Sequence, residues 1–350
     1  PNNPVKGAAM RAVTFQAPGE VRVETVSDPV LCEPTDAIVR VTLSAVCGSD
    51  LHIYHGRFPR IPPGAILGHE FLGRVEEVGS DVSRVSPGMR VVASFFSWCG
   101  TCAACLAGQM SQCEHLETFG FGQLAGAQAE RVRVPRADTT LVPVPDALPD
   151  DAAVMAGDIL STAFFSAERA GIRPGDTVAV VGAGPVGLLA IQCAALYSPA
   201  AILALERVDE RLRLAASFGA QPVPADADAT AAVRSYTAGQ GVSAVIEAVG
   251  SRESLNLAIA LAAPFGTVSA AGVFAERDLP VDMARLFNRD LTLRSGLGNV
   301  PAVIDRVMAL TVAGRLQPQR IVSHRMPLHE AEEAYRRFDR REALKILLLP

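Results

Sequence analysis

The sequence has few aromatic residues and no concentration of positive charge. Phe, Trp and Tyr make up 5% of its 350 residues, with one Trp, and the formal net charge is −5 with a pI near 5.8. No run of Lys or Arg stands out, so neither a nucleic acid nor an anionic membrane surface is an expected partner. The segment 1–13 lacks the apolar core of a signal peptide, and we therefore expect a cytoplasmic protein.

One stretch resembles a membrane span in composition. Residues 178–205 are uncharged, and about 20 apolar residues suffice to cross a bilayer. Glycine, proline and a Ser-Pro pair divide this stretch, so we predict strand, helix and strand instead. With 49% hydrophobic and 20% charged residues, the chain is expected to form two globular domains and not to be disordered.

The two parts of the chain differ in periodicity. Short alternating segments with Pro, Gly and Asp between them predict an antiparallel or barrel-like β domain over the first 150 residues, with strands at 10–15, 21–26, 37–43, 71–79, 90–95 and 127–135. Beyond residue 155, apolar strands at 177–183, 201–206, 243–250 and 266–273 alternate with helices at 185–197, 209–219, 228–238 and 252–263. This alternation predicts a parallel doubly wound α/β sheet. In the tail, helix 328–338 is expected to carry the ion pairs Glu332–Arg336 and Glu333–Arg337.

Four of the seven cysteines fall within residues 97–114, in the spacing C-x2-C-x2-C-x7-C; they are Cys99, Cys102, Cys105 and Cys113. Disulfides are not expected in a reducing compartment, and clustered thiolates suit a tetrahedral metal, with zinc as the first candidate. Four thiolates also fill the coordination shell and leave no position for water or a substrate. We therefore predict a structural metal site here and look for the chemistry elsewhere.

A glycine-rich turn opens the second half of the chain. Gly182, Gly184 and Gly187 stand in G-x-G-x-x-G register between a predicted strand and a predicted helix. The first glycine permits the tight turn, the second lets the backbone approach a pyrophosphate, and the third allows close helix packing. The residues predicted to bind a dinucleotide are Gly182, Gly184, Pro185, Val186, Gly187, Glu206 and Arg207.

Two adjacent residues bear on the choice between NAD and NADP. Glu206 ends the second strand of this half, where a carboxylate can accept hydrogen bonds from the ribose and would repel a 2′-phosphate. Arg207 could pair with that phosphate. Because successive residues at a strand end point in different directions, and the spacing places Glu206 toward the ribose, we predict that NAD is preferred over NADP.

Two further segments, 46–56 and 68–82, supply the remaining unusual residues, which are Cys47, Ser49, Asp50, His52, His69 and Glu70. Cysteine, histidine and carboxylate together make a borderline-soft donor set that suits zinc. Three protein ligands would leave the fourth position of the metal open. This combination predicts a second metal site, which is catalytic.

At this point the sequence resembles the zinc-dependent medium-chain alcohol dehydrogenases. Residues 68–82 fit the family signature G-H-E-x2-G-x5-G-x2-V, the four-cysteine segment and the glycine turn follow in the family's chain order, and the resemblance runs from Met10 onward. It implies a GroES-like, β-rich catalytic domain at 1–158 and 299–350, with the structural zinc lobe at 97–114. A Rossmann domain is implied at 159–298.

The resemblance also implies which residues hold the catalytic zinc. Cys47 and His69 match the family's two constant ligands. Asp158 stands where many members have cysteine and would be the third ligand, as in the branch that includes secondary-alcohol and glutathione-independent formaldehyde dehydrogenases. Gly48 departs from an arginine of some members, which removes one contact to the cofactor phosphates.

Four more residues receive roles from the resemblance. Glu70 is similar to a glutamate behind the zinc that can exchange with its water. Asp50 corresponds to the carboxylate that orients the ligand histidine, a partner that metal-bound imidazole generally needs. Ser49 and His52 match the relay that carries the alcohol proton to solvent.

The implied activity is that of a zinc-dependent alcohol dehydrogenase, which reversibly oxidises an alcohol to an aldehyde or ketone with hydride transfer to NAD(P). Two zinc ions per chain, an alcohol or carbonyl substrate, and a homo-oligomer, dimer or tetramer, are expected. A polyol or formaldehyde dehydrogenase of the same family stays open. So does a protein of another class, a zinc-module binding or regulatory protein, although the acidic balance disfavours it.

Overall fold

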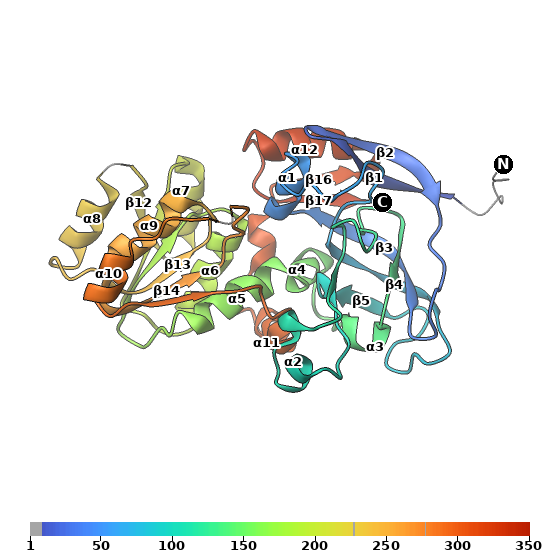
Figure 1. Cartoon of the computed structure of the whole chain (residues 1–350), viewed down its shortest axis with the longest axis horizontal. Coiled ribbons are helices and arrows are strands. Elements are labelled where there is room, and N and C mark those ends of the chain that lie inside the picture. The colour runs from blue at the N-terminus through green and yellow to red at the C-terminus, as the bar shows by residue number, and fades with distance from the viewer. Residues whose placement is uncertain (1–8, 227, 277) are drawn as a thin grey trace. The chain divides into compact units, whose positions relative to one another are not determined.

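The computed structural model describes residues 9–226, 228–276 and 278–350, and the chain divides into two compact units (Figure 1). Unit 1 comprises Pro1–Asp158, Val300–Met308 and Pro318–Pro350, and unit 2 comprises Ile159–Asn299 and Ala309–Gln317. The segment 1–13, in which no signal peptide is expected, lies partly outside the described residues, because residues 1–8 are not described. Among the residues described, no helix has the length and apolar character needed to cross a membrane.

Unit 1 is built mainly of strands. Its largest sheet has the order β16–β17–β3–β4–β5–β9, with β8 paired to β3, and its neighbours are antiparallel except for β16 and β17. Two small antiparallel sheets, β1–β2 and β6–β7, complete it. The strands are β1 (Ala9–Ala17), β2 (Glu20–Ser27), β3 (Ala37–Val46), β4 (Glu70–Val78), β5 (Arg90–Ala93), β6 (Phe96–Ser97), β7 (Glu117–Thr118), β8 (Arg131–Val134), β9 (Leu141–Pro143), β16 (His324–Pro327) and β17 (Ile346–Leu349). The prediction of a β-rich domain is confirmed.

Short helices cap and link these strands. They are α1 (Gly48–Tyr54), α2 (Ala103–Leu106), α3 (Ala137–Thr140), α4 (Asp150–Ala156) and α12 (Ala331–Asp339), with 3-10 turns η1 (Met110–Gln112), η2 (Pro318–Ile321) and η3 (Leu328–Glu330). In α12 the expected pair Glu333–Arg337 forms, but Arg336 pairs with Glu333 and not with Glu332. Arg336 and Arg337 both donate to Glu333 at 2.9 Å, at spacings i,i+3 and i,i+4, because one carboxylate can accept from two guanidinium groups.

The pairing of β3 with β4 brings together two segments that are separate in the sequence. The strands run antiparallel, and Ala45 near the end of β3 lies opposite Glu70 at the start of β4. Cys47 follows β3 directly and His69 precedes β4 directly. The register of this sheet therefore places the two segments with unusual residues side by side.

Unit 2 is a six-stranded, all-parallel sheet with the order β12–β11–β10–β13–β14–β15. This is the doubly wound order, and its reversal point lies between β10 and β13. The sequence predicts this architecture because β10 (TVAVV) and β13 (VSAVIE) are short apolar runs that are buried on both faces. The strands are β10 (Thr177–Val181), β11 (Ala201–Glu206), β12 (Gln221–Pro224), β13 (Val242–Glu247), β14 (Ala262–Ala270) and β15 (Thr292–Ser295).

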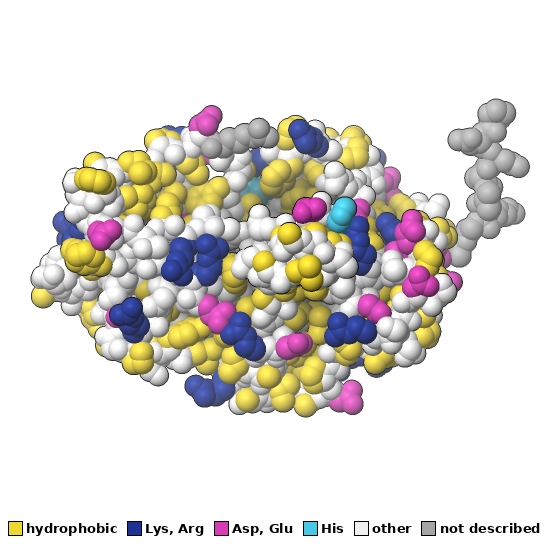
Figure 2. All heavy atoms as spheres, turned by 60° about the horizontal axis from the view of Figure 1, so that its bottom comes forward, with side chains coloured by type: hydrophobic (Ala, Val, Ile, Leu, Met, Phe, Trp, Pro, Cys, Tyr) yellow, Lys and Arg dark blue, Asp and Glu magenta, His cyan; other side chains and the backbone are white. Residues whose placement is uncertain are grey.

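Helices cover both faces of the parallel sheet (Figure 1). Helix α6 packs between α5 and α7, and α9 packs between α8 and α10. Their bounds are α5 (Ile159–Arg169), α6 (Pro185–Ala195), α7 (Asp209–Ser217), α8 (Ala229–Tyr236), α9 (Arg252–Leu261), α10 (Met283–Asn288) and α11 (Val300–Val312), the last of which contributes residues to both units. On the face shown in Figure 2, acidic and basic side chains are interspersed, and the basic ones form no continuous stripe.

Candidate active site

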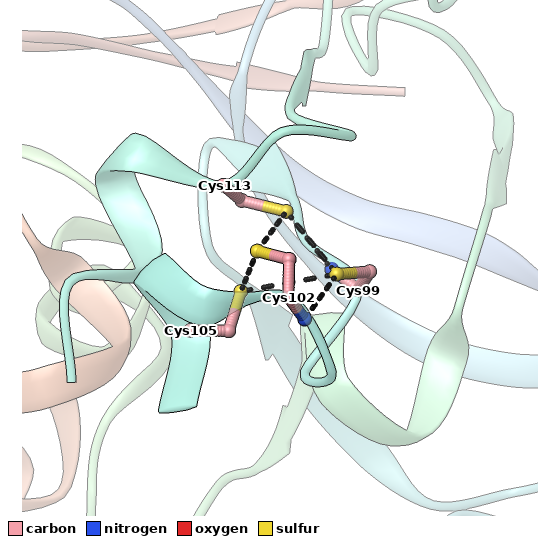
Figure 3. Close-up of side chains that lie close together, drawn as sticks. All are labelled: Cys99, Cys102, Cys105 and Cys113. Atoms are coloured by element: carbon pink, nitrogen blue, oxygen red, sulfur yellow. Dashed lines mark hydrogen bonds between the residues drawn. The ribbon is translucent and has the colours of Figure 1, made fainter. Parts of the chain in front are cut away.

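The four clustered cysteines converge on one point (Figure 3). The pairing of β6 with β7 closes the base of this lobe, and Cys102 precedes α2. The Sγ atoms of Cys102 and Cys105 are 3.4 Å apart, and those of Cys99 and Cys113 are 3.5 Å apart. A tetrahedron with Zn–S bonds of about 2.3 Å has S···S edges of about 3.8 Å. The spacing of the sulfurs therefore fits a zinc ion.

Hydrogen bonds and burial act in opposite directions on the thiols of this lobe. Backbone N–H groups of Thr101 and Cys102 lower the pKa of Cys99 to about 5. Burial, followed by the hydrogen bonds of its own thiol to the neighbouring sulfurs, raises the pKa of Cys105 to about 12. A divalent cation would favour the thiolate of all four residues, and their sulfurs would fill its shell.

A second group of donor atoms comes from three separate segments of unit 1. Ligand atoms of Cys47, His69, Glu70 and Asp158 all lie within 4.8 Å of one another, and all four residues are buried. Asp158 follows α4, and its Oδ2 atom is 3.7 Å from Cys47 Sγ and 3.3 Å from His69 Nε2. The structure thus brings together the three residues expected to bind the catalytic zinc.

Two residues of α1 contact this group. The Ser49 hydroxyl oxygen lies 3.3 Å from Cys47 Sγ and 3.1 Å from His69 Nε2. Asp50 is completely buried, accepts the Cys47 backbone N–H through Oδ2 at 2.9 Å, and presents Oδ1 at 3.2 Å from His69 Nδ1. An acceptor at Nδ1 leaves Nε2 as the nitrogen that can bind a metal.

The electrostatics of this group fit a bound cation. Burial, together with the carboxylates of Glu70 and Asp158, raises the pKa of the Cys47 thiol to about 11. The pKa of His69 is raised well above its ordinary value, because Asp50 and Cys47 outweigh the effect of burial, which lowers it. Anionic donors that disfavour one another's charge in a buried space match the requirement of Zn²⁺ for deprotonated ligands.

Lys345 is a residue that the sequence analysis missed. Its ammonium donates to Glu70 Oε1 at 2.7 Å and to the Val46 carbonyl at 3.0 Å, and its side chain is completely buried. The signal in the sequence was compositional: Lys6 and Lys345 are the only lysines of the chain. A lysine within the apolar tail ALKILLLP is unusual enough to suggest a buried partner.

His52, the expected proton relay, lies two residues beyond Asp50 on α1. Its Nδ1 atom accepts a hydrogen bond from Arg57 at 3.1 Å, and no hydrogen bond joins it to Ser49 within the described residues. Burial, followed by the charges of Arg57 and His55, lowers its pKa. The lowered pKa and the neighbouring Arg57 guanidinium both disfavour a charged His52.

Aromatic rings lie next to the metal donors. The ring centroids of Phe121 and Phe95 are 5.6 Å and 6.4 Å from that of His69. Phe58 contacts both Phe121 and His52, at 5.6 Å and 5.9 Å. Nothing local in the sequence distinguishes Phe58, Phe95 or Phe121 from core residues.

In unit 2 the glycine turn connects β10 to α6. Gly182 has φ +90°, and a Cβ at Gly187 would lie 1.8 Å from the Gly182 carbonyl oxygen, so both positions require glycine. A Cβ on Gly184, the N-cap of α6, would meet only the guanidinium of Arg211 at 3.9 Å. The open space at Gly184 allows a phosphate to approach the free N–H groups of the helix start.

Glu206 is joined to this turn. Its Oε2 atom accepts the backbone N–H of Ala183 at 3.0 Å and lies 3.7 Å from the Arg211 guanidinium. Arg207 is exposed and donates to the carbonyl of Ala225 at 3.3 Å. Arg211, which the sequence analysis did not consider, is therefore the cation next to both Glu206 and Gly184.

Comparison with known protein families gives two matches in the order of the two units. Residues 33–146 match the alcohol dehydrogenase GroES-like domain, and residues 185–313 match the zinc-binding dehydrogenase domain. The alcohol dehydrogenase TADH from Thermus sp. ATN1 superposes with a TM-score of 0.92 at 48% identity, over 97% of this chain and 99% of that one. A Mycobacterium tuberculosis protein described as a probable zinc-binding alcohol dehydrogenase is 38% identical over 93% of this chain and 84% of its own length.

The chain belongs to the zinc-dependent medium-chain alcohol dehydrogenase family, and it is an oxidoreductase that acts on alcohols. Its fold is a GroES-like domain combined with a Rossmann-like parallel sheet, as predicted. A solved relative from Sinorhizobium meliloti 1021, which is 31% identical with a TM-score of 0.86, is described as bound to NADP. Another from Escherichia coli CFT073, which is 26% identical with a TM-score of 0.87, is described as complexed with NADH. They cover 98% of this chain and all of their own.

Proposed function

We propose that Cys47, His69 and Asp158 hold a catalytic zinc ion at which an alcohol is oxidised with transfer of hydride to a nicotinamide cofactor. The observation that carries this proposal is the convergence of their donor atoms within 4.8 Å in a chain of this family. A zinc ion bound there supplies Lewis-acid chemistry that lowers the pKa of the alcohol. Unit 1 is then the catalytic domain, and unit 2 is the cofactor domain.

The residues around these ligands have separate tasks in the proposal. Asp50 fixes the orientation of the His69 ring through Nδ1. Ser49 is close enough to two ligands for its hydroxyl to contact an alcohol oxygen in the remaining position, and His52 is proposed as a further member of the proton relay. Glu70 lies behind the ligands, where Lys345 holds its Oε1 atom.

The four-cysteine lobe is proposed to hold a second, structural zinc, which gives two zinc ions per chain. Support comes from its S···S distances of 3.4 to 4.0 Å and from backbone N–H groups that point at the sulfurs of Cys99 and Cys113. Metal analysis of the purified protein tests this part directly. One zinc per chain would contradict it.

NAD is proposed as the preferred cofactor. Glu206 stands at the carboxyl end of β11 beside the glycine turn, where a carboxylate pairs with ribose hydroxyls and repels a 2′-phosphate. The Arg211 guanidinium lies 3.7 Å from that carboxylate, so the negative charge of Glu206 reduces the attraction of Arg211 for a 2′-phosphate. The opposing contribution of Arg207 is reduced by its contact with Ala225.

An apolar primary or secondary alcohol is the proposed substrate class. The rings of Phe58, Phe95 and Phe121 lie around His69 and His52, and they offer no hydrogen bonds to the hydroxyl groups of a polyol. A polyol or formaldehyde dehydrogenase activity is the alternative that these apolar rings disfavour or do not address.

A panel of short alcohols, secondary alcohols, polyols and formaldehyde, assayed by reduction of NAD, tests the substrate class. We expect kcat/KM to rise with the apolar length of the alcohol and Phe121→Ala to reduce that dependence. A preference for polyols would contradict the assignment. No oxidation of any alcohol by a protein that holds two zinc ions would contradict the proposed function as a whole.

We also propose a homo-oligomer. In the described sheet of unit 2, β15 is the last strand and all four of its residues are exposed, so one row of its backbone groups has no strand partner. Exposed apolar side chains occur nearby in sequence, among them Phe287 and Met283 of α10. Light scattering of the purified protein distinguishes a monomer from a dimer or tetramer.

A further inference from the structure

Gln128 is a completely buried glutamine whose segment does not form the strand expected there. The predicted strand covered residues 127–135, but β8 begins only at Arg131. Residues 127 and 128 instead bond to the segment that leads to His69: Gln128 N–H donates to the Leu67 carbonyl, and Ala127 N–H donates to that of Gly68, both at 2.9 Å. Gln128 is thus fixed beside the backbone that carries a proposed metal ligand.

Close packing confirms this position. Gly68 has φ +95°, and a Cβ on it would lie 2.4 Å from Gln128 Cγ. The glycine of the G-H-E sequence therefore gives Gln128 the room to pass over the chain immediately before His69. A side chain at position 68 would displace one of the two segments.

The amide of Gln128 uses all of its hydrogen-bonding groups. Its Nε2 donates to the Ala45 carbonyl at 3.1 Å and to Asp50 Oδ2 at 3.2 Å, and its Oε1 accepts the hydroxyl of Tyr335 at 2.8 Å. A carbonyl and a carboxylate can only accept, so the amide cannot be turned around. Tyr335 of α12 is itself completely buried, and the hydrogen bond that its hydroxyl donates to Oε1 requires the same orientation of the amide.

These contacts form a continuous chain that ends at the metal donors. Tyr335 donates to Gln128, Gln128 donates to Asp50, and Asp50 presents its second oxygen to His69 Nδ1 at 3.2 Å. Asp50 Oδ2 has two donors, the Gln128 amide and the Cys47 backbone N–H at 2.9 Å. Loss of the Gln128 donor would leave a buried carboxylate held at one point and free to rotate away from His69.

We propose that Gln128 is a positioning residue of the catalytic metal site, which holds Asp50 against His69 and is itself oriented by Tyr335. The proposal rests on the proposed function, because His69 must be a zinc ligand for the chain of contacts to matter. Partners behind a metal-bound histidine change metal affinity by about 10- to 100-fold when they are removed. The expected signature is therefore a weaker hold on one of the two zinc ions.

The experiment measures zinc release from the purified zinc-loaded enzyme into an excess of a chromogenic chelator. The phase due to the catalytic site is identified as the one that Cys47→Ala lacks, and the other phase is an internal control within each molecule. We expect Gln128→Leu to accelerate the catalytic phase by about 10-fold or more and to leave the other phase unchanged. Tyr335→Phe, which removes one hydrogen bond and keeps the ring, should accelerate it less.

Gln192 of unit 2 supplies a matched control. It is also buried, and it exchanges hydrogen bonds with the backbone of Gln317. Gln192→Leu should lower thermal stability without a change in either zinc phase.

Three outcomes decide the matter. If Gln128→Leu lowers stability as Gln192→Leu does, with unchanged zinc release, Gln128 has only a structural role and the proposal is wrong. If Gln128→Leu does not fold, Gln128→Asn and Tyr335→Phe decide the question by the same measurement. The proposal is wrong if neither variant accelerates the catalytic phase. If Cys47→Ala retains both phases, the proposed function fails first, and with it the role of Gln128.

Discussion

Lys345 Nζ lies 2.7 Å from Glu70 Oε1, although 275 residues separate them, and neither side chain is exposed. Lys345 directly precedes β17, which pairs with β3 so that Ile346 lies opposite Val46, and its ammonium also binds the Val46 carbonyl. The last strand of the chain thus delivers a positive charge behind the proposed zinc ligands. A buried charge of this kind is stable only with its partner.

Removal of one member of this pair is expected to be costly. Lys345→Met leaves the charge of Glu70 buried without its partner, and we expect a loss of about 3–5 kcal/mol in the free energy of unfolding. Adding Glu70→Gln to that variant should recover part of the loss. Denaturant unfolding of wild type and of the single and double variants measures the coupling.

Arg336→Met is the control, because the pair of Arg336 with Glu333 is exposed and should contribute less than about 1 kcal/mol. Burial opposes the charge of Lys345, but Glu70 and Cys47 raise its pKa above the ordinary value. The contribution of the Lys345 charge to stability is therefore present below the ordinary lysine pKa and is lost as the pH rises through the raised pKa. A Lys345→Met variant as stable as Arg336→Met would contradict this account.

The two metal sites should fail in different ways. Cys47→Ala removes a proposed catalytic ligand, so turnover should be lost while dinucleotide binding and the fold persist. Cys102→Ser removes one of four structural ligands and should lower the melting temperature, by about 2–4 °C for each kcal/mol lost. Calorimetry, nicotinamide titration and turnover on both variants provide the comparison, and the reverse pattern would exchange the two roles.

The proton relay predicts a particular pH profile. Because burial and the charges of Arg57 and His55 lower the pKa of His52, the acidic limb of alcohol oxidation should lie below pH 6.5. Arg57→Gln removes a cation that opposes protonation, so it should move this limb to higher pH. Arg60→Gln, on the same loop, is the control and should leave the limb in place.

A His52→Gln variant should lose rate mainly on the acidic side, and small amine buffers should restore part of it. The profile is measured as kcat/KM for the alcohol against pH. If neither Arg57→Gln nor His52→Gln alters its shape, His52 is a packing residue beside Phe58 and takes no part in proton transfer.

Cofactor preference should depend on Glu206. In wild type, kcat/KM should be higher with NAD than with NADP. Glu206→Ser should lower the value for NAD by about 10-fold or more, since hydrogen bonds to a charged group contribute about 1.5–3 kcal/mol. The same variant should gain activity with NADP, because Arg207 and Arg211 can then meet the 2′-phosphate. Glu210→Ser removes an equal charge four residues along the chain, in α7, and should change neither value. A wild type that prefers NADP would show that the arginines govern the pocket.

Features with a local signal were predictable from the sequence. The strand of unit 2 predicted at 201–206 is β11, and the helix predicted at 185–197 is α6 (Pro185–Ala195), because apolar periodicity and turn residues fix both within a few positions. The cysteine spacing predicted a cluster, and the four sulfurs do converge. The sequence also named Cys47 and His69 as metal donors, although their roles remain a proposal.

Features that depend on distant pairing were not predictable. Gln128 reaches Asp50 across 78 residues and Tyr335 across 207, and nothing near any of them in the sequence indicates a contact. Gln128 was assigned to a strand because its neighbours alternate in polarity, and only the pairing with Leu67 shows why the strand begins later. Arg211 was overlooked for a similar reason, since its proximity to Gly184 depends on how α7 packs next to β11.

The burial of Lys345 also determines how the protein can be modified chemically. It is the one lysine among the described residues, and its amine is enclosed and paired with Glu70. Reagents that acylate or cross-link primary amines therefore find no exposed lysine in the part of the chain that the structure describes, where all other fixed positive charges are guanidinium groups. Amine-directed labelling or attachment to a support should consequently spare the described residues of both units and the two proposed zinc sites, provided the enzyme stays folded during the reaction.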